Sequence, residues 1–225
     1  LIKMKRIKEV FCVIAISFTA ASAAAQTDSA KNLSNFLFPE FSKCIIKFKA
    51  GDSKTAVINY NVIDEELVFQ QSDAYMVLDN PSIIDTIYVN DRKFVPVGSL
   101  FYEVVLSNPI ISLFIQYKSI VEDTGVPTAY GASTKTNDTR YTKQIYGPIG
   151  SLNLSVPDNL KVTDKTIYWV GKDSSLEKFN TERQFLKIFK VKEKELNQFI
   201  DSNNIDFKKP GDIIKVCNYY IAINK

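Results

Sequence analysis

The stretch Lys43-Cys44-Ile45-Ile46-Lys47-Phe48-Lys49 decides the fold class of this chain. Its lysines fall on one parity, whereas Cys44, Ile46 and Phe48 fall on the other. Alternation with a period of two is the signature of a strand that buries one face. The stretch therefore predicts a half-buried β-strand in which the thiol of Cys44 points inward.

Similar short β-prone runs follow at regular intervals, and residues that favour turns, such as Asn108-Pro109, separate them. This spacing predicts an antiparallel β-meander, closed as a curved sheet, a sandwich or a partly open barrel so that its edges are hidden. The predicted strands cover residues 55–62, 66–70, 75–78, 85–89, 93–97, 101–106, 112–118, 151–156 and 165–172.

Helical periodicity begins only near Asn180, which argues against alternating βαβ units and favours an α+β fold. Asn180 or Thr181 can cap a first helix, and a second is expected over 192–203. Pro210 suits the first turn of a last helix, whose apolar stripe ends at Ile221. Two or three C-terminal helices should therefore pack on the sheet over residues 181–225.

The N-terminal residues have the three zones of a cleavable secretory signal peptide. Cations at Lys5, Arg6 and Lys8 precede the apolar run 10–21, and the small residues Ala23-Ala24-Ala25 follow it. The apolar run is shorter than the roughly 20 residues of a membrane-spanning helix. We expect cleavage near Ala25 and a periplasmic or extracellular location.

The domain organisation follows from these assignments. Residues 1–25 are the predicted signal peptide and 26–35 a flexible leader, and the β-rich domain spans 36–180. Small polar residues and tyrosines replace aliphatic ones between 122 and 150, which predicts a long loop there. The segment 181–225 completes the chain with its helices.

The charge balance points away from nucleic acid. The whole chain carries a formal net charge of +3, but residues 1–25 hold four cationic side chains and one acidic side chain. The remaining chain is therefore nearly neutral, and nothing in it predicts nucleic-acid binding. It also contains no further apolar stretch of membrane-spanning length, so we expect it to be soluble.

The residue inventory excludes most common catalytic chemistry. The chain has no histidine, which rules out Ser-His-Asp triads and histidine-ligated metals. Its eight glycines form no phosphate-binding fingerprint, and we expect neither a metal nor a cofactor. The adjacent pairs Glu65-Glu66 and Glu122-Asp123 are interpreted as turn or solvent charges, because neighbours on a strand face opposite ways.

Two cysteines remain after the predicted cleavage, in a compartment that permits disulfides. Cys44 lies on the first strand and Cys217 on the last helix, both on apolar faces. They could form a disulfide that joins the two ends of the domain. The alternative is two separate buried thiols, because cysteine also behaves as a small apolar residue.

The long loop supplies the candidate binding residues. Its tyrosines could stack on sugar rings or anchor a partner protein, with cationic side chains beside them. The alternative is a solvated loop whose tyrosines cover the rim of the sheet. The candidates are Tyr130, Lys135, Arg140, Tyr141 and Tyr146.

Six short segments resemble a group of uncharacterised exported proteins of Gram-negative bacteria that carry a domain of unknown function. The resemblance implies an envelope location and brings no established activity. The segments are Val77-Leu78-Asp79-Asn80-Pro81, Asp85-Thr86-Ile87, Arg92-Lys93-Phe94-Val95-Pro96-Val97, Tyr102-Glu103-Val104, Ala129-Tyr130-Gly131 and Asn204-Ile205-Asp206-Phe207-Lys208-Lys209.

The sequence thus favours a non-enzymatic binding or structural module of the cell envelope, acting through its sheet surface and the long loop. One alternative is a periplasmic carrier of an apolar ligand or lipoprotein within a half-open barrel. Another is a carboxylate-dependent glycan hydrolase, which needs two facing acidic groups about 5 to 9.5 Å apart. An envelope protein, a glycan and an apolar ligand are the candidate partners.

Overall fold

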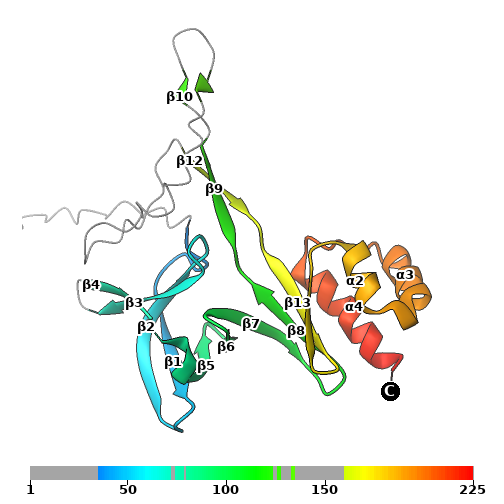
Figure 1. Cartoon of the computed structure of the whole chain (residues 1–225), viewed down its shortest axis with the longest axis horizontal. Helices are drawn as coiled ribbons and strands as arrows, with labels where there is room; N and C mark the ends of the chain where they lie inside the picture. Colours follow the sequence, from blue (N-terminus) through cyan, green and yellow to red (C-terminus); the bar gives the residue numbers. More distant parts are fainter. Residues whose placement is uncertain are drawn as a thin grey trace, which may run out of the picture. The chain divides into compact units, whose positions relative to one another are not determined.

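The computed structural model describes residues 35–71, 74–78, 80–123, 126–127, 133–134 and 160–224. Ten antiparallel strands form one open sheet in the order β14-β13-β8-β7-β6-β5-β1-β2-β3-β4 (Figure 1). The strands are β1 (Ser42–Phe48), β2 (Ser53–Asn61), β3 (Glu66–Gln71), β4 (Ala74–Val77), β5 (Ile84–Val89), β6 (Arg92–Val97), β7 (Leu100–Ser107), β8 (Ser112–Gln116), β13 (Ile167–Lys172) and β14 (Ser175–Phe179).

The chain makes two meanders that share β1. The first runs from β1 to β4, and the 3-10 helix η1 (Pro81–Ile83) then leads into β5, which pairs with the other edge of β1. Ile45 faces Thr55 of β2 on one side and Tyr88 of β5 on the other. β1 is therefore a central strand with both edges hydrogen-bonded.

The sheet curls strongly. β3 and β7 are five strands apart in the order and would lie about 24 Å apart in a flat sheet, yet their Cα atoms are in contact. The Ser119 amide donates to the Val62 carbonyl at 2.7 Å, which joins the β2–β3 turn to the segment that follows β8. The curl encloses a core that includes Ile58, Ile87 and Phe94.

A second core lies where β8, β13 and β14 meet the helices α2 (Glu182–Ile188), α3 (Glu193–Ser202) and α4 (Pro210–Ala222). The 3-10 helix η2 (Lys190–Lys192) links the first two. The register places Glu103 beside Ile115, and Ile115 beside Tyr168, so this core covers the same sheet face as the curl. Figure 1 shows the helices next to β13.

A separate two-stranded ribbon prolongs β8 and β13. It consists of β9 (Ser119–Asp123) and β12 (Leu160–Asp164), and the Lys165 amide donates to the Lys118 carbonyl at 2.8 Å where the ribbon meets the sheet. The short pair β10 (Val126–Pro127) and β11 (Ser133–Thr134) lies between β9 and β12 in the sequence.

The α+β fold class is confirmed, with an antiparallel open sheet followed by three helices. Thr181 caps α2 by accepting from the Gln184 amide at 3.3 Å, and Cys44 is buried as expected. The sequence missed β14, because only Phe179 in it is buried and no alternation is visible. It also missed β9 and β12, and the predicted loop 122–150 begins inside β9. The predicted signal peptide, residues 26–34 of the predicted leader and strand 151–156 lie outside the described residues, whereas Asn35, the last leader residue, is buried.

Candidate binding surface

The outer face of β2, β1 and β5 carries exposed apolar side chains where a solvated sheet face is ordinarily polar. Because Cys44 and Ile46 point into the curl, Lys43, Ile45 and Lys47 point outward. Ile45 is 48% exposed, and Tyr88, its cross-strand neighbour on β5, is 37% exposed. This pair forms an apolar centre on the outside of the sheet.

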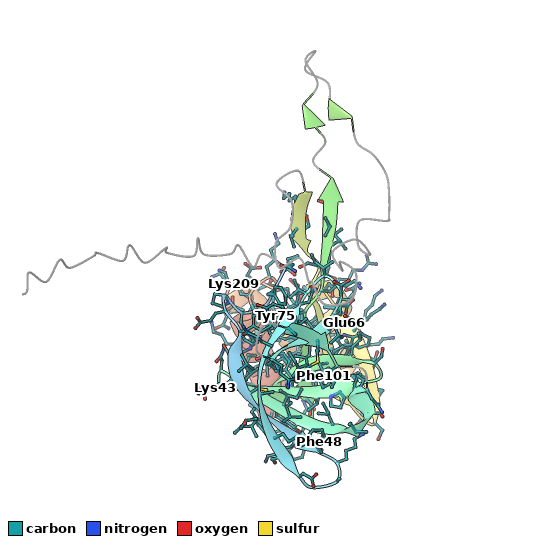
Figure 2. The ribbon with its side chains drawn as sticks, turned by 90° about the vertical axis from the view of Figure 1, so that its left-hand side faces the viewer. Lys43, Phe48, Glu66, Tyr75, Phe101 and Lys209 are labelled. Carbon is teal, nitrogen blue, oxygen red and sulfur yellow. The ribbon has the colours of Figure 1, made fainter. Side chains whose placement is uncertain are left out.

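The pair lies in a shallow hollow of about 810 Å³. Asn90 lies at one end of the hollow and donates through its side-chain amide to the Ser42 hydroxyl at 3.0 Å. In Figure 2, Lys43 lies at the margin of the side chains, whereas Phe101 of the enclosed core lies among them. The lining residues are Lys43, Cys44, Ile45, Thr55, Ala56, Val57, Tyr88, Val89, Asn90 and Asp91.

Three lysines surround this centre. Lys43 and Lys47 flank Ile45 along β1, and Lys93 of β6 is the register partner of Tyr88. Within the described part of the chain, none of the three forms a salt bridge. The ammonium of Lys47 lies 5.3 Å from the centre of the Tyr88 ring, within cation–π range. Asp91 is the acidic residue that lines the hollow.

The inner face differs, because its charges are fully partnered. Arg92 donates from Nε and Nη2 to the two carboxylate oxygens of Glu103, both at 2.8 Å, and the Tyr117 hydroxyl donates to Glu103 at 2.6 Å. The rings of Phe38, Phe94 and Tyr117 lie 5.0, 5.4 and 5.0 Å from the Arg92 guanidinium. Both carboxylate oxygens of Glu103 are therefore occupied by hydrogen bonds from within the fold.

Burial and hydrogen bonding shift the protonation equilibria of this cluster. Burial is the largest single influence on Arg92 and would lower its pKa, but the hydrogen bond to Glu103 and the interactions with Tyr117 and the Glu103 charge together outweigh burial and raise that pKa overall. Burial, followed by the hydrogen bond to Glu103, raises the pKa of Tyr117. Both groups therefore keep their protons over the physiological range, which suits a structural ion pair rather than a proton-transfer site.

A second polar network closes the curl on its outer side. Glu65 accepts hydrogen bonds from the side chains of Gln116 and Lys118, and the Trp169 indole donates to Gln116 at 2.9 Å. Glu65 is only 7% exposed and adopts a left-handed φ of 59°. Glu65 therefore lies in a turn, as one of the two interpretations expected, but it is not a solvent charge. Its partners lie more than 50 positions away along the chain, where no local pattern reveals them.

The two carboxylates of Glu65 and Glu103 do not converge. Glu103 shares a face with Ile115, its register partner, whereas Gln116 follows Ile115 directly and so points to the other face together with Glu65. Each carboxylate also has its own cation, Lys118 or Arg92. Their arrangement does not resemble the facing pair that glycoside hydrolysis needs.

Cys44 and Cys217 are free, buried thiols in two different core clusters. Burial raises the pKa of Cys44 to about 11 and that of Cys217 to about 12. Both groups are thus protonated and unreactive at neutral pH, which fits the interpretation as separate buried thiols.

The candidate loop residues Tyr130, Lys135, Arg140, Tyr141 and Tyr146 lie outside the described residues. Sequence reasoning passed over the outer-face pair of Ile45 and Tyr88. The parity argument had already placed Ile45 on the lysine face, and an isoleucine there was a usable signal. Tyr88 is 43 positions away, and its place beside Ile45 follows only from the register of β5 on β1.

Within the described residues, no helix is long and apolar enough to span a bilayer. No protein-family model, curated protein or solved structure matches the chain. The geometry of the sheet therefore supplies the basis for a functional proposal.

Proposed function

We propose that this chain is an exported, non-enzymatic binding module of the cell envelope, and that it recognises its partner through the outer face of β2, β1 and β5. One observation carries the proposal: Ile45 and Tyr88 are exposed side by side in a hollow of about 810 Å³. Exposed apolar surface with a polar rim is characteristic of binding sites.

The inner face supports this choice over the carrier of an apolar ligand. Bulky side chains fill the curl, including Tyr60 and Phe94, whose rings stack at 6.3 Å, and Phe38, which meets Phe94 edge-on at 6.3 Å. A carrier would need this volume for its ligand. The divergent placement of Glu65 and Glu103 likewise favours binding over carboxylate-dependent hydrolysis.

Co-sedimentation of the purified chain, without residues 1–25, with washed cell envelopes tests the proposal. We expect binding by the wild type and its loss in Ile45→Asp and Tyr88→Ala. Leu176→Asp is the matched control. Leu176 is 38% exposed, and it lies on β14, an edge strand that is several strands away from β5, β1 and β2 in the sheet. Absence of binding by the wild type, or equal binding by all variants, would contradict the proposal.

The same assay separates the sheet face from the long loop. If the loop contributes the recognition site, replacing Tyr130, Tyr141 and Tyr146 by alanine abolishes sedimentation. If the sheet face is sufficient, the triple variant binds like the wild type. N-terminal sequencing of the chain recovered from envelopes tests export, for which we expect Gln26 as the first residue.

A further inference from the structure

We infer that the ligand of the outer face is an acidic polysaccharide, bound with its sugar rings on Ile45 and Tyr88 and its anionic groups near Lys43, Lys47 and Lys93. This inference rests on the proposed function of the same surface. It adds the chemical class of the partner, which follows from the shape of the hollow and the lysines near it.

The charges favour an anionic ligand. Lys43 and Asp91 line the hollow, and Lys47 and Lys93 lie beside Tyr88, which also lines it. None of the three lysines has a salt-bridge partner in the described part of the chain. Lys43 and Lys47 point the same way from β1 and are about 13 Å apart along the strand. Charges spread over this length suit a chain with repeated anionic groups better than a single small anion.

The apolar centre favours sugar rings. The Tyr88 ring and the Ile45 side chain present apolar surface, and Thr55 and Asn90 add polar groups at its border. A saccharide has apolar C–H faces together with hydroxyl groups, so it matches an aromatic ring that is bordered by hydrogen-bonding groups.

The strand pairing disfavours an acidic peptide. Extended peptides commonly bind a sheet by adding a strand at a free edge, where backbone groups are unpaired. Here β1 is paired with β2 and β5 on its two edges. A peptide on this face would find no backbone partners, whereas a polysaccharide needs only the side chains.

The hollow also disfavours a membrane surface. Protein segments that bind a bilayer bury protruding apolar side chains among the lipid headgroups. Ile45 and Tyr88 instead line a concave surface, which accommodates a narrow chain. A membrane remains an outcome that the experiment can detect.

Isothermal titration with polygalacturonate tests the inference, and its fully methyl-esterified form is the matched probe with the same sugars and no charge. We expect polygalacturonate to bind and the ester to bind at least about tenfold more weakly, a loss of about 1.4 kcal/mol. Raising the salt concentration should weaken polygalacturonate binding, because Lys43 and Lys47 are exposed and Lys93 is only partly buried.

Substitutions on the outer face test whether polygalacturonate binds there. Tyr88→Ala and the triple variant Lys43→Gln, Lys47→Gln, Lys93→Gln should each lower polygalacturonate affinity about tenfold or more. Lys178→Gln on β14 should leave the affinity unchanged. Since Tyr88 and Lys43 are exposed, these substitutions should leave the far-ultraviolet circular dichroism spectrum as in the wild type.

Three results would overturn the inference: absence of polygalacturonate binding, equal affinity for polyglutamate, or equal affinity for vesicles of phosphatidylglycerol. If envelope binding depends on Ile45 but polygalacturonate does not compete for it, the proposed function stands and the acidic polysaccharide fails. If the wild type does not bind envelopes, the proposed function fails as well.

Discussion

The two faces of the curled sheet differ in how their charged side chains are paired. On the inner face, Arg92 is bound by Glu103 and surrounded by three aromatic rings. On the outer face, Lys43 and Lys93 have no ionic partner within the described residues, and the apolar side chains beside them are exposed. The inner face therefore has the features of a structural core, and the outer face has those of a recognition surface.

The largest effect should come from breaking the inner ion pair. Glu103→Gln leaves the Arg92 guanidinium without its counter-charge, and the Arg92 side chain is only 26% exposed. We expect a loss of about 3 kcal/mol in the free energy of unfolding, measured with denaturant. Glu177→Gln, on exposed β14, is the control and should change little. A loss below about 0.5 kcal/mol for Glu103→Gln would show that the pair is not structural.

Cys44 should have a smaller effect, which is a dependence of the free energy of unfolding on pH. The pKa of this thiol rises from 9.0 to about 11 on folding, so the folded state retains a proton that the unfolded state loses above pH 9. The stabilisation that the protonated thiol provides is complete below pH 9. It is lost as the pH rises from 9 through 11, which lowers the free energy of unfolding by about 2 kcal/mol.

Chemical denaturation of the wild type and of Cys44→Ala between pH 8 and 11 measures this contribution. The difference in unfolding free energy between the two proteins should shrink as the pH rises. A constant difference would contradict the burial of a neutral thiol. Intact-mass measurement without reductant should also give the reduced-form mass, because both thiols are buried and free.

Removal of the hydroxyl group should affect the free energy of unfolding differently at two tyrosines inside the curl. The Tyr117 hydroxyl donates to Glu103, so Tyr117→Phe should lower the unfolding free energy by about 1 to 2 kcal/mol. The Tyr60 hydroxyl is buried and has no hydrogen-bond partner among the described residues, so Tyr60→Phe should be neutral or stabilising by up to about 1 kcal/mol. Equal destabilisation in thermal unfolding would refute this distinction.

Substitutions on the outer face should have the smallest effect on stability. Lys43→Gln and Tyr88→Ala remove exposed side chains, so each should change the unfolding free energy by no more than about 0.5 kcal/mol. A loss above about 2 kcal/mol for Tyr88→Ala would mean that the outer face also stabilises the fold.

Local patterns predicted the elements but not the long-range networks. The alternation in 43–49 predicts both β1 and the inward thiol of Cys44, and the capping residue Thr181 predicts the start of α2. Each of these signals lies within a few residues of the element that it specifies. Local alternation and capping are therefore sufficient where burial on one face decides the structure.

The networks depend on register and curvature, which a single sequence does not reveal. Arg92 meets Glu103 because β6 and β7 pair with a particular register, and Glu65 meets Gln116 because the sheet curls back on itself. The surface around Ile45 and Tyr88 has the same origin, since β5 reaches β1 only after the chain passes three other strands. The loop candidates remain predictions.

The most direct test of the recognition surface is amide chemical-shift mapping of the isotope-labelled protein titrated with polygalacturonate. We expect the largest shift changes on residues 43–47, 55–57, 88–91 and 93, while the amides of the inner-face residues Glu103 and Tyr117 change less. Changes confined to the inner face or to the helices, or no changes at saturating ligand, would contradict this expectation.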